Sequence, residues 1–190
     1  MDNNKIFWHF KKTVSGVLVS YSDIELDFKT SEIPLSLTLP REAQQNTKDQ
    51  QIGDEIPVIS FKVVKLSQKE GKTFKEKFLN KLNYHVTNKK VKKRLVEIPE
   101  NFDFNRFLVI EDFNTSGLTG EYKNFDKMEK EEGNFYSFMW IVGESGKGGT
   151  KGGRRGLGRN VFAFASYFRS FFVLTKRYDD KKKFLMGFSN

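Results

Sequence analysis

The chain has 190 residues, and its hydrophobic content of 37%, with 20 phenylalanines, is enough to build the core of one domain. The absence of cysteine excludes disulfide bonds and thiolate zinc sites, and no apolar run approaches the ~18 residues of a membrane span, so we expect a cytoplasmic protein. A net charge of +9 indicates either a phosphate-bearing partner, nucleotide or nucleic acid, or simply a solvated basic surface, which we favour for the short lysine clusters.

The first half of the chain predicts strands around a helix. Alternating apolar residues at 5–28 predict one or two strands, and 56–66 predict another. A helix is expected at 39–52, with Pro40 in its first turn, where the missing N–H costs nothing. The lysine-rich residues 67–100 follow, and we interpret them as an insertion with weak helical character.

The second half begins with a buried strand predicted at 106–113. The long stretch 121–153 is charged, then aromatic, then rich in glycine, and irregular stretches of this length in compact domains are often lids. A helix is expected at 156–168. Strands at 169–177 and 183–188 are expected to form a hairpin.

Three polar blocks carry the candidate chemistry, and the first lies on the helix at 39–52. Glu42, Asn46 and Asp49 are spaced by four and three residues, which places them on one helix face. A carboxylate there can deprotonate a water, and an amide oxygen one turn later can complete a Mg²⁺ shell. For this block by itself, an ordinary polar helix face is the favoured interpretation.

The second block follows the strand at 106–113. Asp112 stands where the strand ends and can accept a hydrogen bond from an exocyclic amine such as that of adenine. Asn114, Gly117 and Gly120 come next, and glycines allow a sharp turn or a close approach of the backbone to a base. A strand followed by a polar turn explains this block equally well.

The third block is a glycine-rich loop that opens a helix, which is typical of an anion site because free N–H groups meet the ligand without Cβ atoms in the way. Its candidate cofactor-binding residues are Lys151, Gly153, Gly156, Leu157 and Gly158. Function is favoured over a flexible linker here, since an apolar helix follows directly. Just upstream, Gly143–Thr150 almost forms a P-loop, but Lys147 stands two residues too early, and a P-loop is kept only as a weak alternative.

Together the three blocks resemble the GHKL ATPase superfamily, the group of gyrase, MutL and the histidine kinases. Residues 42–49 look like its N-box, Asp112 with the two following glycines looks like its first glycine box, and 153–158 look like its second. The resemblance covers roughly 35–177 and implies an α+β fold of the Bergerat type. In that fold, a two-layer sandwich, a mixed β-sheet carries helices on one face.

The resemblance implies that residues 1–190 form a single ATP-binding domain with 121–153 as the ATP lid. It also implies a role for each matched residue: Glu42 as general base, Asn46 as Mg²⁺ ligand, Asp112 as adenine acceptor, Asp49 as support for the base-binding region, and Gly156 and Gly158 as backbone phosphate contacts. The first glycine box is longer than usual. The family's threonine-bearing strand near adenine and the phosphate-binding lysine of its transducer domain are not evident, so we expect downstream elements to be missing.

The sequence therefore predicts a module that binds ATP and hydrolyses it with Mg²⁺ to drive lid closure or dimerisation, with a homodimer as a possible partner state. Two alternatives stay open. One is a basic nucleic-acid-binding module without ATPase activity, in which aromatic residues and lysines of 121–155 contact bases and phosphates. The other is a nucleotide sensor that binds ATP without hydrolysing it.

Overall fold

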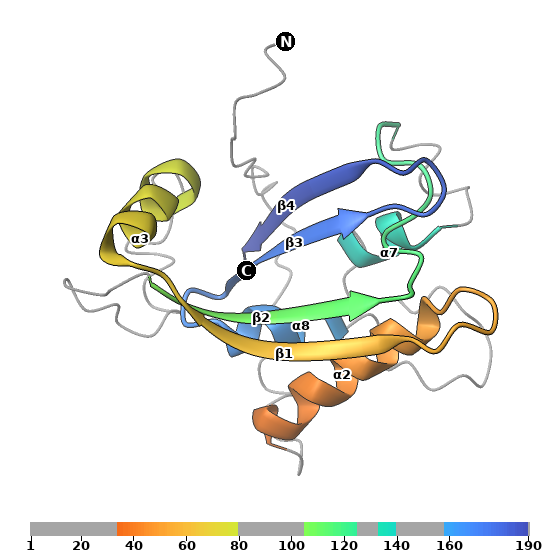
Figure 1. Ribbon diagram of the computed structural model, residues 1–190, viewed down its shortest axis with the longest axis horizontal. Helices are drawn as coiled ribbons and strands as arrows, with labels where there is room; N and C mark the ends of the chain where they lie inside the picture. Colours follow the sequence, from red (N-terminus) through yellow and green to blue (C-terminus); the bar gives the residue numbers. More distant parts are fainter. Residues whose placement is uncertain (1–33, 80–104, 125–132, 140–157, 190) are drawn as a thin grey trace, which may run out of the picture. The chain divides into compact units, whose positions relative to one another are not determined.

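A computed structural model describes residues 34–79, 105–124, 133–139 and 158–189 of the chain (Figure 1). The strands expected at 5–28 lie outside these ranges, as does most of the glycine-rich loop. No helix in the described part is long and apolar enough to cross a membrane.

The described residues form helices and two small β-sheets, and the fold is therefore of the α+β class (Figure 1). β1 pairs with β2, and β3 pairs with β4. The elements in chain order are α2 (Leu35–Asp49), β1 (Val58–Lys65), α3 (Gln68–Phe74), the π-helical turn η1 (Lys75–Leu79), β2 (Arg106–Phe113), α7 (Asn134–Met139), α8 (Gly158–Ala165), β3 (Ser170–Lys176) and β4 (Lys183–Ser189).

The chain divides into two compact units. The first contains the described residues 60–79 and 105–110, and the second contains 34–59 and the described residues from 111 to 189. The candidate site residues that the structure describes all belong to the second unit.

In the first unit, the strand predicted at 106–113 is confirmed as β2, but its predicted burial is wrong, because Leu108 is 50% exposed. α3 begins with a capping box, in which Ser67 and Glu70 bond to each other's backbone N–H groups. The Phe74 ring packs edge-on against Phe107, with 4.8 Å between centroids. The insertion therefore begins as a capped helix with an aromatic face.

In the second unit, α2 begins four residues before the predicted start, at Leu35. Pro40 lies inside the helix, where it removes one backbone hydrogen bond. The helix still forms because Leu39, Ala43 and Thr47, each one turn apart, make a buried stripe. The Thr47 hydroxyl donates to the Ala43 carbonyl at 2.9 Å, which satisfies the one polar group of the stripe.

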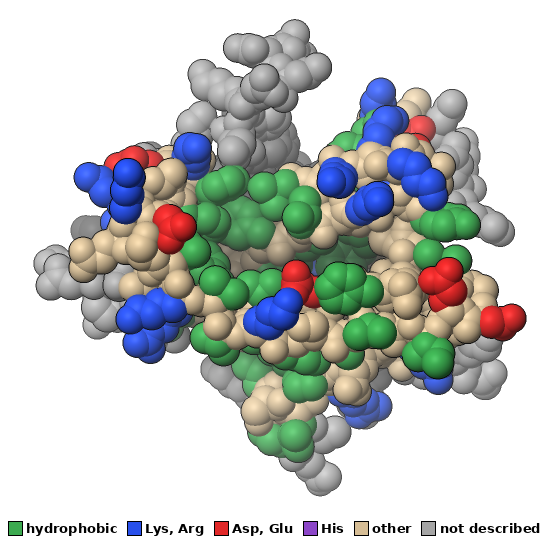
Figure 2. Space-filling view, viewed as in Figure 1, with side chains coloured by type: hydrophobic (Ala, Val, Ile, Leu, Met, Phe, Trp, Pro, Cys, Tyr) green, Lys and Arg blue, Asp and Glu red, His purple; other side chains and the backbone are tan. Residues whose placement is uncertain are grey.

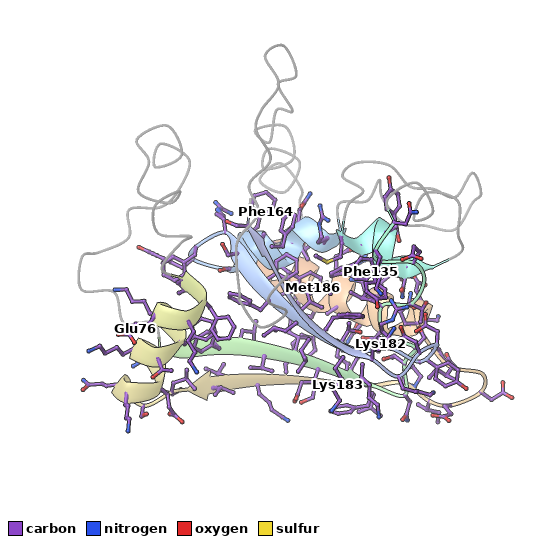
Figure 3. All side chains as sticks on the ribbon, turned by 90° about the horizontal axis from the view of Figure 1, so that it is seen from above. Glu76, Phe135, Phe164, Lys182, Lys183 and Met186 are labelled. Atoms are coloured by element: carbon purple, nitrogen blue, oxygen red, sulfur yellow. The ribbon has the colours of Figure 1, made fainter. Side chains whose placement is uncertain are left out.

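The core of the second unit is built from α8, the β3–β4 hairpin and α7. α8 packs against α2 and β3, and its Val161 is fully buried. Phe135 of α7 is buried together with Leu118, and Met186 of β4 packs against them (Figure 3). α7 lies inside the stretch 121–153, for which the sequence predicted no regular structure.

The predicted hairpin is confirmed. β3 and β4 are antiparallel, with Ser170 opposite Ser189 and Lys176 opposite Lys183, and residues 177–182 connect them. Because strand side chains alternate between faces, Thr175 points into the unit while Leu174 is exposed. This alternation determines which hairpin residues can reach the loop after β2.

Candidate functional site

The first and third sequence blocks meet where α2 packs against α8. Glu42 is half-buried, and its Oε2 atom lies only 2.8 Å from the position that a Cβ atom would take on Gly158. Gly158 is the first residue of α8, where the backbone N–H groups have no partner within the helix. The structure therefore places the candidate carboxylate directly against the candidate phosphate-binding helix start.

The other residues of these two blocks are not part of the contact between Glu42 and Gly158, or they lie outside the described residues. Asn46 is half-buried on α2, one turn after Glu42. Asp49 is exposed, and its Oδ1 accepts a 3.0 Å hydrogen bond from Gln45 Nε2 of the same helix. Four members of the third block lie outside the described residues: Lys151, Gly153, Gly156 and Leu157.

Asp112 is the second-last residue of β2. Its side chain reaches the surface, yet partial burial of the carboxylate raises its pKa above the ordinary value, against the opposing effect of hydrogen bonds from its own backbone and from Thr115. Asn114 follows with a left-handed backbone (φ 60°), and its amide donates to the Ile56 carbonyl at 3.0 Å. Asn tolerates this conformation better than most residues.

We call residues 114–120 the glycine turn. Gly117 has φ 63°, and a Cβ atom there would lie 2.6 Å from the Lys176 carbonyl oxygen and 2.7 Å from Thr175 Oγ1. Gly120 has φ 95°. Both conformation and space therefore demand glycine at 117, which explains this part of the sequence motif.

Side chains from the ends of α2 and α7 hold the glycine turn. Gln50, directly after α2, accepts hydrogen bonds from Ser116, at its backbone oxygen from the N–H (2.9 Å) and at Oε1 from the hydroxyl (2.7 Å). Asn134 begins α7, and its Oδ1 accepts from the Thr119 N–H at 2.6 Å. The Asn134 amide group donates to the Gly117 carbonyl at 2.9 Å and to Gln50 Oε1.

Thr175 of β3 and the following Arg177 also hold the turn, and the sequence analysis had singled out neither residue. The buried Thr175 hydroxyl accepts a 2.9 Å hydrogen bond from the Leu118 N–H. Arg177 is only 3% exposed, and its guanidinium donates to the carbonyls of Leu118 (2.9 Å) and Gly120 (2.7 Å). These bonds fix the carbonyls and N–H groups of the turn in one arrangement.

Acidic residues of the hairpin connection compensate the buried Arg177 charge. Arg177 pairs with Asp179 at 2.7 Å and with Asp180 at 2.9 Å, and Lys182 pairs with Asp180 at 3.2 Å. Desolvation works to raise the pKa of Asp180, but hydrogen bonds from Lys182 and Arg177 outweigh it and lower this pKa to about 2. Hydrogen bonds to Tyr122 and to Asp180 raise the pKa of Lys182.

One sequence signal could have found Thr175 and Arg177. They continue the inward-facing alternation of Val173 at the end of a predicted strand, where a polar residue must find partners inside the unit. No comparable signal marks Gln50 or Asn134, because their partners are distant in sequence.

α2 connects the two parts of the candidate site. Glu42 faces the start of α8, and Gln50, eight residues later, binds the glycine turn. At a rise of ~1.5 Å per residue these contacts are about 12 Å apart along the helix. Both contacts therefore depend on one helix, α2.

Among the described residues, no three His, Cys, Asp or Glu side chains gather as a ready-made metal site. A Mg²⁺ ion held by one amide and by ligand phosphates needs no such group, because Mg²⁺ keeps several waters and takes few protein ligands. Comparison of the chain with models of known protein families, with curated proteins and with solved structures finds no match.

Proposed function

We propose that the second unit binds ATP with Mg²⁺ in a GHKL-type site between the glycine turn and the start of α8, and that it hydrolyses the γ-phosphate. One observation carries the proposal: α2 joins the helix start that contacts Glu42 to the turn that follows Asp112. The sequence blocks assign the helix start to phosphate and the turn after Asp112 to adenine.

At the adenine end, the Asp112 carboxylate accepts the exocyclic amine of the base. Thr175 supports the assignment, since its hydroxyl lies against Gly117, and the resemblance implies a threonine-bearing strand near adenine. The proposal makes β3 that strand, which is not evident from the sequence alone. The bonds from Gln50 and Asn134 keep the turn open for a base by holding its backbone in place.

At the phosphate end, the backbone N–H groups at the start of α8, which have no partner within the helix, bind phosphate oxygens, and the helix dipole favours the phosphate charge. Asn46 would hold Mg²⁺, and the bound ion would neutralise part of the phosphate charge. Glu42 accepts a proton from the attacking water, which forms a bond to the γ-phosphorus as the bond to the ADP oxygen breaks. The Glu42 contact with Gly158 keeps the carboxylate beside the phosphates.

The Bergerat arrangement is the finer part of the fold proposal. That arrangement is a mixed β-sheet with helices on one face. The packing of α8 against both α2 and β3 supports this for the second unit.

Thermal stability with and without nucleotide tests binding. We expect ATP with Mg²⁺ to raise the melting temperature, since a ligand of the native state stabilises it by mass action. Asp112→Asn should lose most of this rise, because a charge-assisted hydrogen bond typically contributes ~1.5–3 kcal/mol. Asp54→Asn, at an exposed residue of the same unit, is the matched control. Equal shifts for both variants would overturn the adenine assignment.

Turnover is tested separately. Glu42→Gln should bind ATP nearly as well as the parent and hydrolyse it about 10²–10⁴-fold more slowly. Glu111→Gln is the control, because Glu111 is the next candidate for the base. The assay should cover a range of protein concentrations, since the proposed activity involves a homodimer. ATP binding without turnover at any concentration would identify a nucleotide sensor instead.

A further inference from the structure

The connection between β3 and β4 presents a second, basic feature that the proposed ATP site does not use. Residues 176–183 carry five basic and two acidic side chains. The buried Arg177 pairs with both acids and Lys182 pairs with Asp180, so these two cations offset the two acidic charges. The other three basic side chains, Lys176, Lys181 and Lys183, are exposed. Figure 2 shows Lys and Arg side chains gathered over the hairpin.

A pocket of about 240 Å³ lies among these residues, lined by Thr115, Lys176, Arg177, Tyr178 and Lys181. Tyr178 is 54% exposed, and the Lys181 ammonium lies 4.0 Å from the centre of its ring. Lys181 adopts a left-handed backbone (φ 59°) that turns the chain at this point. An aromatic ring and two lysines therefore border one hollow.

The pocket adjoins the glycine turn through Thr115 and Arg177, whereas its exposed lysines and Tyr178 are not among the residues proposed to bind ATP. Thr175 and Lys176 are consecutive residues of β3, so their side chains leave the strand on opposite faces. Thr175 contacts the glycine turn at Gly117, whereas the Lys176 side chain is exposed.

We propose that this hairpin end binds single-stranded nucleic acid, with Lys176, Lys181 and Lys183 contacting successive phosphates and Tyr178 stacking on an unpaired base. Several exposed lysines along a strand end suit a chain of phosphates better than one isolated anion. An exposed tyrosine in their midst suits a base, since every base has a face that can stack on an aromatic ring. Duplex DNA offers the phosphates but hides the base faces, which is why we commit to a single strand.

Fluorescence anisotropy of a labelled single-stranded oligothymidine, titrated without ATP at several salt concentrations, tests the lysines. Each phosphate contact contributes about 0.7 to the salt slope of single-strand binding, so replacing all three lysines by glutamine should reduce the slope by about 2. The control is the exposed triple Lys69→Gln, Lys72→Gln and Lys77→Gln, which removes the same charge elsewhere and should leave the slope unchanged.

The stacking contact has its own pair of variants. Tyr178→Ala should weaken binding about 5- to 100-fold, the range expected for one base stack, whereas Tyr178→Phe should keep the affinity. Failure of the parent to bind the oligonucleotide, an equal slope change in the control triple, or equal binding of duplex DNA would overturn the proposal. Tighter, hairpin-dependent binding to anionic phospholipid vesicles would replace it with a membrane surface. Because no ATP is present, these outcomes are independent of the proposed ATPase.

Discussion

The two ends of the candidate site are built differently. The glycine turn is held by Gln50, directly after α2, whose backbone oxygen accepts from the Ser116 N–H, and by the side chains of Asn134 and Thr175, which bond to its backbone. At the start of α8, Glu42 lies against Gly158, and the same first turn of the helix contains Asn160, which is 1% exposed. Neither the amide nitrogen nor the oxygen of Asn160 has a hydrogen-bond partner. One end is satisfied by the protein, and the other contains polar atoms that the protein leaves unsatisfied.

This difference bears on how such a site would work. A turn whose polar groups are already bonded keeps its shape before a ligand arrives, so binding there costs little ordering. The backbone N–H groups of a helix start have no partner within the helix and can bind an anion. In the proposed function, the adenine end therefore selects the ligand and the phosphate end responds to it.

Removal of the Arg177 side chain should cause the largest loss of stability among the changes at the glycine turn. Arg177→Met leaves the carbonyls of Leu118 and Gly120 without their donor and Asp179 without its cation, while Asp180 keeps only Lys182. We expect a loss of about 3 kcal/mol in the free energy of unfolding, at the lower end of the range for breaking a buried ion pair because both acids are partly exposed. Urea denaturation measures this, and Arg41→Met, at an exposed position on α2, should change stability by less than about 0.5 kcal/mol.

Two glycines with nearly the same backbone conformation test whether the turn is crowded as well as bent. Gly117 and Gly53 have φ 63° and 52°, but only Gly117 has neighbours within reach of a Cβ atom. Gly53→Ala should cost about 1 kcal/mol for the left-handed conformation. Gly117→Ala should cost about 2–3 kcal/mol, because the backbone of Lys176 must also move. Equal losses, measured by urea denaturation, would mean that the turn is not packed against β3.

The local sequence pattern predicted the strands and helices well, but it predicted poorly how they contact one another. β2 and the β3–β4 hairpin were predicted within a residue or two, because apolar alternation and the Asp179–Asp180 turn are local signals. The start of α2 was missed because Pro40 suggests a first turn, whereas the buried stripe of Leu39 and its neighbours extends the helix through it. Local sequence rules do not describe how tertiary packing overrides a propensity.

The same limit applies to the site. The resemblance of the three blocks to the GHKL pattern predicted that α2 and the start of α8 belong to one site; the structure places Glu42 beside Gly158, and the site itself stays a prediction. The bond between Asn134 and Gln50 spans 84 residues, and that between Arg177 and Leu118 spans 59. Nothing near either residue in the sequence indicates its partner, so the support of the glycine turn could only be found in the structure.

Two asparagines compare the two ends of the site directly: Asn134 is half-buried at the glycine turn, and Asn160 is buried at the start of α8. Asn134→Ala removes the acceptor for the Thr119 N–H and the donor for the Gly117 carbonyl, and should cost about 1–2 kcal/mol. Asn160→Ala removes an amide that makes no hydrogen bond, and should cost less than about 1 kcal/mol or even stabilise the protein. Thermal unfolding of both variants without nucleotide is the measurement. A larger loss at Asn160 would show that the start of α8 is bonded in the free protein.

The smallest expected effect is on stability at acid pH, and it tests the ion pairs that Asp180 makes with Arg177 and Lys182. The pKa of Asp180 is held at about 2 in the folded protein, below its ordinary value. A depressed carboxyl pKa stabilises the fold above the unfolded pKa near 4, and this contribution is lost as the pH falls through the folded value. Asp180→Asn should therefore be less stable than the parent at pH 5, with the difference shrinking toward zero between pH 4 and 2.

The stability contribution of Asp112 should have the opposite sign. Because its pKa is raised, the cost of ionising it in the folded state grows as the pH rises above the ordinary carboxyl range. Urea denaturation of both Asp→Asn variants at a series of pH values measures the two trends, and a constant gap for Asp180→Asn across the acid range would mean that its ion pairs with Arg177 and Lys182 do not form in solution.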